Sequence, residues 1–173
     1  MDILPDLISS QLALLIIPRE DRDAMLALAA RLAGHGLLRV LDGGNSFNIH
    51  RLTRPLRHQT PDLEAALERI TVARAFTCYQ MAALLSQAQT LPVLTLVLNL
   101  LATFLDENVE LGERLRLLQA CLADLHRLRR SAPVIVTVWE GTDEKMLTIL
   151  EDAIDQVWRA ELPPPIPEPP RLF

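Results

Sequence analysis

Residues 12–32 read LALLIIPREDRDAMLALAARL, an apolar run followed by a short charged segment and then a helix-forming run. The apolar run is continuous rather than alternating, which is typical of a strand that is covered on both faces in a parallel sheet. Five apolar residues of the segment 20–33 fall on one broad helical face: Met25, Leu26, Leu28, Ala29 and Leu32. The stretch therefore predicts the strand–loop–helix unit of an α/β fold.

Four more apolar runs predict strands, at residues 37–42, 70–76, 93–100 and 133–139. Helical patterns lie between and after them, at residues 60–69, 79–87, 109–130 and 143–162, with Thr60 expected as the N-cap of the first. Strands that alternate with helices form parallel sheets with right-handed crossovers. We therefore expect an α/β fold with a doubly wound, mostly parallel five-stranded sheet between two helical layers, which makes three layers.

The length of 173 residues suits one domain, which we expect over residues 1–162. Residues 163–173 read PPPIPEPPRLF, and six of these eleven residues are proline, so we expect a proline-rich extended tail. Such a tail either docks on an aromatic groove of a partner or is a disordered, solubilising end.

The composition disfavours some classes of function. The net charge of −5 disfavours broad binding to a phosphate backbone, although a local basic patch is compatible with it. No apolar stretch reaches about 18 residues without a charge or a proline, so we expect no membrane span. Cys78 and Cys121 lack the spacing of a paired motif, and we expect two reduced thiols in a cytoplasmic protein.

Four stretches resemble, in the same order, the core of the RecA/RadA recombinase-like ATPases. VLDGGNSFNIHRL (40–52) resembles the second-strand motif of that family, in which Asp42, Phe47, Arg51 and Leu52 match. VARAFTCYQMAALL (72–85) is similar to the family's Ala-Arg-Ala-Phe segment with its following Gln and two Leu.

The other two stretches lie further along the chain. LTLVLNLLATFL (94–105) occupies the place of the Walker B strand, and ELGERLRLLQACLADLHRL (110–128) resembles the long helix after it. The resemblance covers roughly residues 12–140. It implies a RecA-like P-loop NTPase core with the strand order 3-2-4-5-1.

The chain departs from that family in the phosphate-binding loop. Aligned after the first strand, Pro18 replaces the loop's first glycine, and Asp23, Ala24 and Met25 replace its last Gly, its Lys and its Ser/Thr. A P-loop needs those glycines to expose backbone N–H groups, and it needs the Lys and Ser/Thr to bind phosphate and magnesium. The loop therefore lacks the groups that hold a triphosphate.

Three more positions have lost the family's polar residues. Asn99 stands at the Walker B Asp, Gly44 at the catalytic Glu, and Val138 with Trp139 at the polar sensor. Four losses together imply that ATP hydrolysis is gone, and we expect no cofactor and no catalytic residue.

Acidic residues lie where phosphate would sit, namely Glu20, Asp21 and Asp23, and only Arg19 and Arg22 offset them. We interpret the acids as groups that stabilise a helix N-terminus against its dipole. The alternative is a changed ligand site, for example one for a cation.

A basic segment, HRLTRPLRH (50–58), follows the second strand. Its arginines Arg51, Arg54 and Arg57 are spaced by three, so a helix would align them. They are either a solvated face or a contact for an anionic partner or nucleic acid, although no interleaved aromatic residue supports base stacking. His35, His50, His58 and His126 have no paired spacing, and we expect no metal.

These observations lead to three functional hypotheses. The first is a catalytically inactive RecA-like pseudo-ATPase that acts through protein contacts or self-association, and the resemblance suggests an accessory role in DNA recombination or repair. The alternative is a module that binds a small anion or nucleotide near Gly43, Gly44 and Arg51 without hydrolysis. The third is an unrelated enzyme that uses Asp42, for which no base–nucleophile pair is evident.

Overall fold

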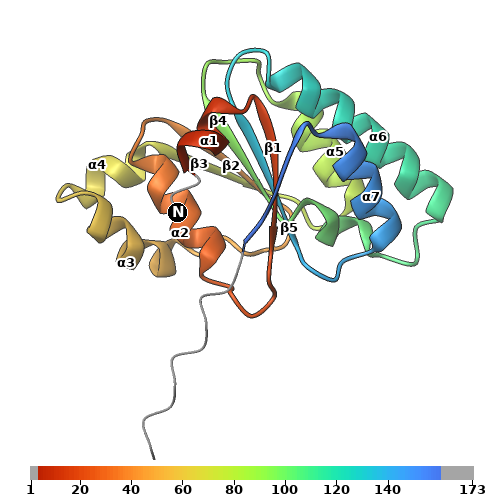
Figure 1. Cartoon of the computed structure of the whole chain (residues 1–173), viewed down its shortest axis with the longest axis horizontal. Coiled ribbons are helices and arrows are strands. Elements are labelled where there is room, and N and C mark those ends of the chain that lie inside the picture. Colours follow the sequence, from red (N-terminus) through yellow and green to blue (C-terminus); the bar gives the residue numbers. More distant parts are fainter. Residues whose placement is uncertain (1–3, 161–173) are drawn as a thin grey trace, which may run out of the picture.

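The computed structural model describes residues 4–160, which form one α/β sheet with helices on both sides (Figure 1). The tail expected at residues 163–173 lies outside the described residues. In chain order the elements are α1 (Leu4–Ser9), β1 (Leu12–Ile17), α2 (Ala24–Ala33), β2 (Leu38–Asp42), α3 (Ile49–Gln59), α4 (Leu63–Glu68), β3 (Ile70–Arg74), α5 (Cys78–Gln87), β4 (Leu94–Leu98), η1 (Leu100–Phe104), α6 (Leu111–Leu128), β5 (Val134–Trp139), α7 (Glu144–Ala153) and β6 (Gln156–Arg159).

The sheet has the order β3-β2-β4-β5-β1-β6, and each pair of neighbouring strands is parallel. The doubly wound α/β class is thus confirmed, and its first five strands follow the expected order 3-2-4-5-1. The expected count of five strands is wrong, because β6 adds a sixth strand beside β1. Ala13 aligns with Gln156 and Ile16 with Arg159 in this extra pairing.

The last helix is shorter than expected, since residues 143–162 do not form one helix. Helix α7 ends at Ala153, and Ile154 takes an extended conformation with φ −116° and ψ 126°. Apolar residues continue at helical spacing beyond that point, which explains the expectation. The unpaired edge of β1 offers backbone hydrogen bonds that a longer helix would leave unmade, and the chain pairs with it instead.

The two faces of the sheet bury two separate apolar clusters. Alternate residues of β1 belong to each of the two clusters, because successive side chains of a strand point to opposite faces of the sheet. Leu12, Leu14 and Ile16 pack with α5, η1, α6 and α7, whereas Ala13, Leu15 and Ile17 pack with α1, α2, α3 and α4. Figure 1 shows these helical groups on opposite sides of the sheet, which gives three layers.

Side-chain caps fix where several helices begin. Asn48 accepts hydrogen bonds from the N–H groups of His50 and Arg51 at the start of α3. Asp62 caps α4 by accepting from Ala65 N–H, so the expected N-cap Thr60 is wrong by two residues; the Thr60 hydroxyl instead accepts from Asp62 N–H. Each cap satisfies an N–H group that the helix itself cannot pair.

Helix α6 buries its apolar face within the domain. Leu117, Leu118, Cys121, Leu122 and Leu125 are all buried, and the helix packs beside α5. No helix within residues 4–160 has both the length and the apolar character needed to cross a membrane.

Candidate functional site

The carboxyl ends of the parallel strands meet at one edge of the sheet, where open α/β sheets place their ligands. The connections that follow β1, β2, β4 and β5 lie there. The residues aligned with ATP-handling positions lie in these connections or in the adjoining ends of α2 and β5. Met25 is fully buried, Pro18 and Asn99 are buried, Gly44 and Ala24 are half-buried, and Asp23 is exposed.

The β1–α2 connection is held by its own side chains. Asp21 accepts a hydrogen bond from Ala24 N–H at 3.1 Å, so one carboxylate occupies the first amide of α2. Asp23 points away to form an ion pair with Arg51 on α3. Arg19 donates to the carbonyl oxygens of Glu140 and Gly141 after β5. Of the three acids, Asp21 is therefore the one that stabilises the helix start.

The Asp42 carboxylate organises the β2–α3 loop. It is fully buried and accepts from the N–H groups of Gly44 and Ser46 through Oδ1 and from that of Phe47 through Oδ2, at 3.2, 2.9 and 2.9 Å. Arg74 Nε lies 3.6 Å from Oδ2. Both carboxylate oxygens accept hydrogen bonds from the loop that follows β2, so Asp42 stabilises the conformation of this loop.

The end of β4 packs directly on this loop. Asn99 is 6% exposed, takes a left-handed conformation with φ 50°, and donates its N–H to the hydroxyl of Thr137 at 3.0 Å. Thr137 also lies 3.6 Å from the sulfur of Met25. The positions that resemble a Walker loop, a Walker B strand and the fifth strand therefore lie together. Their residues pack directly against one another.

A cavity of about 340 Å³ remains at this edge. Arg19, Arg22 and Arg51 line it together with Trp139 and residues 44–46 and 48 of the β2–α3 loop. Arg22 forms no hydrogen bond or ion pair with any residue of the described part of the chain. The structure thus brings Gly44 and Arg51 together at this cavity, whereas Gly43, the third residue of the anion-binding hypothesis, is buried and does not line it.

Helix α3 carries the predicted basic segment. Arg51 and Arg54 line a groove of about 470 Å³ between α2 and α3, whereas Arg57 is exposed but does not line it. The groove has an apolar floor, which sequence reasoning missed because the floor comes from two helices.

The open edge of the sheet is a second feature that the sequence analysis missed. Within residues 4–160, strand β3 pairs with β2 alone, and Thr71, Val72 and Arg74 are exposed. A pocket of about 270 Å³ lies beside it, between β2, β3 and α5. The charged Arg74 within the run 70–76 was the available signal, because edge strands tolerate charge.

The thiols and the metal-ligand side chains give no reactive cluster. Cys78 and Cys121 are both free and buried, and burial raises the pKa of the Cys121 thiol to about 12. No set of three or more His, Cys, Asp or Glu side chains within residues 4–160 is placed to hold a metal ion.

Comparison with protein-family models and with curated protein sequences finds no match to this chain. The geometry of the described residues therefore has to carry the functional argument.

Proposed function

We propose that this chain is a RecA-like domain without ATP hydrolysis that acts by assembling with other protein chains. The observation that carries the proposal is the open edge of the sheet at β3, with an apolar pocket next to it. An accessory role in DNA recombination or repair follows from the resemblance alone, and the proposed cytoplasmic location rests on the two free thiols.

The β1–α2 connection supports the loss of hydrolysis. Asp21 occupies the first amide of α2, and the Asp23–Arg51 ion pair lies at the end of the helix where a triphosphate would be bound. An incoming phosphate would meet two carboxylates there before it reached an N–H group, and like charge opposes binding. The proline at position 18 also supplies no N–H group.

The β3 edge supports assembly. A strand at the edge of a sheet presents backbone N–H and C=O groups that another strand can pair with. Val72 is 40% exposed at the centre of the strand, and Phe76 just after it is 66% exposed. Natural proteins usually blunt such an edge with charge, whereas this one carries a single Arg74 at its end.

A second copy of this chain fits the edge. Antiparallel pairing of two β3 strands about a two-fold axis through Val72 would place Val72 opposite itself, Thr71 opposite Ala73 and Ile70 opposite Arg74. No like charges face one another in that register. The partner's adjoining residues would cover the pocket beside β3.

Sedimentation velocity of the full chain, from micromolar to millimolar concentration, tests the assembly. We expect wild type to form a dimer and Val72→Lys to remain monomeric, because two lysines would oppose each other across the axis. Val157→Lys is the matched control, since Val157 is 39% exposed on β6, the strand at the opposite edge. A monomeric wild type, or equal effects of the two lysines, would contradict the proposal.

Calorimetric titration with ATP and magnesium, repeated with ADP, tests the loss of the nucleotide site. We expect no saturable heat at high protein concentration. Release of phosphate from ATP in proportion to enzyme concentration would overturn the proposal of a pseudo-ATPase.

A second candidate function is the binding of a small anion without hydrolysis. The observation in its favour is the cavity at the carboxyl edge, which Arg19, Arg22 and Arg51 line. Arg19 is held by two carbonyl oxygens and Arg51 by Asp23, so Arg22 is the arginine that an anion would engage first.

Pyrophosphate is a suitable probe for this candidate. Saturable binding that Arg22→Gln weakens, and that Arg130→Gln in the exposed turn after α6 leaves unchanged, would favour it. Absence of heat with pyrophosphate would remove this candidate and leave the assembly proposal intact.

A further inference from the structure

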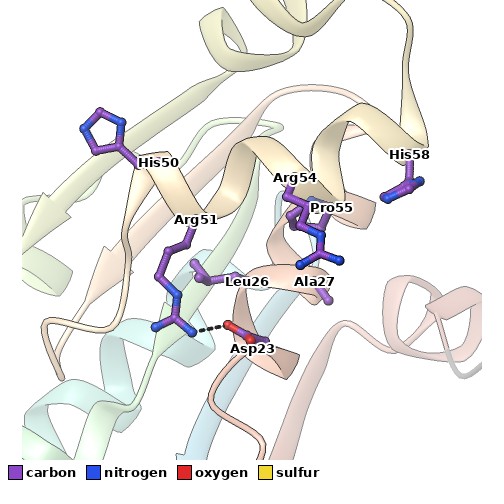
Figure 2. Close-up of a pocket in the computed structure, with 8 residues that line it drawn as sticks. All are labelled: Asp23, Leu26, Ala27, His50, Arg51, Arg54, Pro55 and His58. Carbon is purple, nitrogen blue, oxygen red and sulfur yellow. Dashed lines mark hydrogen bonds and ion pairs between the residues drawn. The ribbon is translucent and has the colours of Figure 1, made fainter.

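The groove between α2 and α3 has an apolar floor. Leu26 and Ala27 of α2 and Pro55 of α3 face it, and Figure 2 shows all three between the two helices. Leu26 is buried beneath, and Ala27 is half-buried. Pro55 presents an apolar ring on the side of α3 that faces α2. An apolar concavity of this kind accommodates an aliphatic or aromatic side chain of a partner.

The sides of the groove are cationic. Arg54 extends from α3 toward Ala27, and His58 lies at one end of the groove (Figure 2). At the other end Arg51 reaches down to Asp23, and a dashed line marks their ion pair (Figure 2). The one carboxylate that lines the groove is thus already paired with an arginine.

The other two arginines of α3, Arg54 and Arg57, have no acidic partner among residues 4–160. The helix holds three arginines and two histidines and no acidic residue. Neither Arg54 nor Arg57 forms a hydrogen bond or an ion pair with any residue among positions 4–160. In a chain with a net charge of −5, this concentration of positive charge on one helix is a local feature and not a property of the whole surface.

Apolar floor and cationic sides together specify the chemistry of the ligand. A nucleic acid would use the arginines through its phosphates, but no Phe, Tyr or Trp among residues 4–160 lines the groove for its bases, and the imidazoles of His50 and His58 are the only aromatic rings there. A peptide with an apolar side chain between carboxylates matches both features, because the apolar group fills the floor and the carboxylates accept from the guanidinium groups.

We propose that the α2–α3 groove binds an acidic segment of a partner protein, with one apolar side chain on Leu26, Ala27 and Pro55 and a neighbouring carboxylate on Arg54. The groove is separate from the β3 edge, because the residues that line it belong to α2, the residue before it and α3, and none belongs to β3. Each surface can therefore be tested without the other.

Titration followed by ¹⁵N NMR spectroscopy of the full chain tests the proposal at near-physiological salt. The probe is a blocked synthetic peptide with a central leucine between two pairs of glutamates. Two control peptides replace the glutamates by glutamine or the leucine by alanine. We expect saturable shifts of the Ala27 and Arg54 amides with the probe, and much weaker binding of both controls.

Two variants of the same helix distinguish a groove from a general basic surface. Arg54→Gln should weaken peptide binding about fivefold, as expected for the loss of one partly exposed charge pair. Arg57→Gln is the matched control, because Arg57 is exposed on α3 and does not line the groove. The Arg57→Gln variant should bind the peptide within twofold of the wild-type affinity, because salt screens the attraction of one exposed charge outside the groove.

Three outcomes would overturn the proposal. The first is the absence of saturable shifts with the probe peptide. The second is equal weakening by Arg54→Gln and Arg57→Gln, which would indicate attraction by charge alone. The third is saturable binding of a single-stranded oligonucleotide of the same net charge without binding of the peptide, which would assign the surface to nucleic acid. The dimer test with Val72→Lys is unaffected by any of them.

Discussion

A Cβ atom placed on Gly44 would lie 2.5 Å from Asn99 Nδ2 and 2.9 Å from Ser46 Oγ. The loop after β2 therefore packs on the residue that ends β4 with no room for a side chain at position 44. In the resembled ATPases these two positions hold a glutamate and an aspartate. In this chain the residues at the two positions are coupled, because an acidic side chain at residue 44 would require Asn99 to move.

Gly44→Ala should destabilise the domain. Real Cβ contacts essentially never come below 3.0 Å, and Asn99 is buried, so the Asn99 and Ser46 side chains or the backbone that carries them have to shift. Overpacking of this kind costs about 1–3 kcal/mol. Urea unfolding followed by circular dichroism measures the change in free energy of unfolding.

Gly112→Ala is the control for this change. Gly112 lies in the first turn of α6, and an added Cβ would meet nothing within 4 Å. Alanine in a helix is about 0.5–1 kcal/mol more favourable than glycine, so the sign of the effect should be opposite. Equal stabilities of the Gly44→Ala variant and wild type would show that the close packing against Asn99 is wrong.

Asp42→Asn should destabilise the loop after β2. The wild-type carboxylate accepts from three backbone N–H groups, whereas an amide has one oxygen and would turn its NH₂ group toward a donor. A buried donor left unpaired costs about 1–3 kcal/mol. Thermal unfolding of Asp42→Asn beside Asp155→Asn measures this, because Asp155 is exposed and forms a surface ion pair with Arg129. A stable Asp42→Asn protein would revive the hypothesis that Asp42 has a catalytic role.

Five of the six strands were predictable because each lies in an apolar-rich run. Strands β1, β4 and β5 are buried along nearly their whole length, whereas β3 is largely exposed at the edge of the sheet. Strand β6 was not, since residues 156–159 are short, mostly exposed and follow an apolar helical pattern without a glycine or proline between them. Its conformation comes from pairing with β1, which is distant in sequence. Helix α1 and the 3₁₀ turn η1 were missed because each is only five or six residues long.

The residue types of the candidate site were predictable, and its shape was not. Ala24, Met25 and Gly44 cannot supply the Lys, Ser/Thr and Glu side chains that an ATPase site needs, and the sequence alone shows this. The Asp23–Arg51 ion pair joins segments 28 positions apart, so it depends on the packing of α2 against α3. The spacing of Arg51, Arg54 and Arg57 indicated one helical face, but only the position of α2 separates Arg57 from the groove.

Asn48→Ala should loosen the start of α3. The Asn48 side chain accepts from the N–H groups of His50 and Arg51, and loss of such a cap costs about 1 kcal/mol. Hydrogen exchange of the first amides of α3 should become faster, while those of α5, which Thr77 caps, should not change. Unchanged exchange in the first turn of α3 would show that the Asn48 cap does not hold it.

The buried thiol of Cys121 predicts how stability changes at alkaline pH. Burial raises the pKa of this thiol from its ordinary value of 9.0 to about 12, and the negative charge of Asp124 adds to this. In the unfolded chain the thiol ionises at about pH 9, so above that pH the unfolded state loses a proton that the folded state keeps. The stabilisation is therefore complete below pH 9 and is lost as the pH rises toward 12, by about 1.4 kcal/mol per pH unit.

Urea unfolding at pH 8.5 and at pH 10.5 measures this loss. Wild type should lose more free energy of unfolding between the two conditions than Cys121→Ala does, although the variant starts from a lower stability because of the cavity it creates. Cys78 is present in both proteins, so its own raised pKa cancels in the comparison. Reaction with a thiol reagent at pH 8 gives an independent reading, because a thiol that stays protonated reacts slowly until the chain unfolds. Parallel pH profiles for the two proteins, together with rapid labelling of Cys121 in folded wild type, would place this thiol in contact with solvent and contradict its burial against α5.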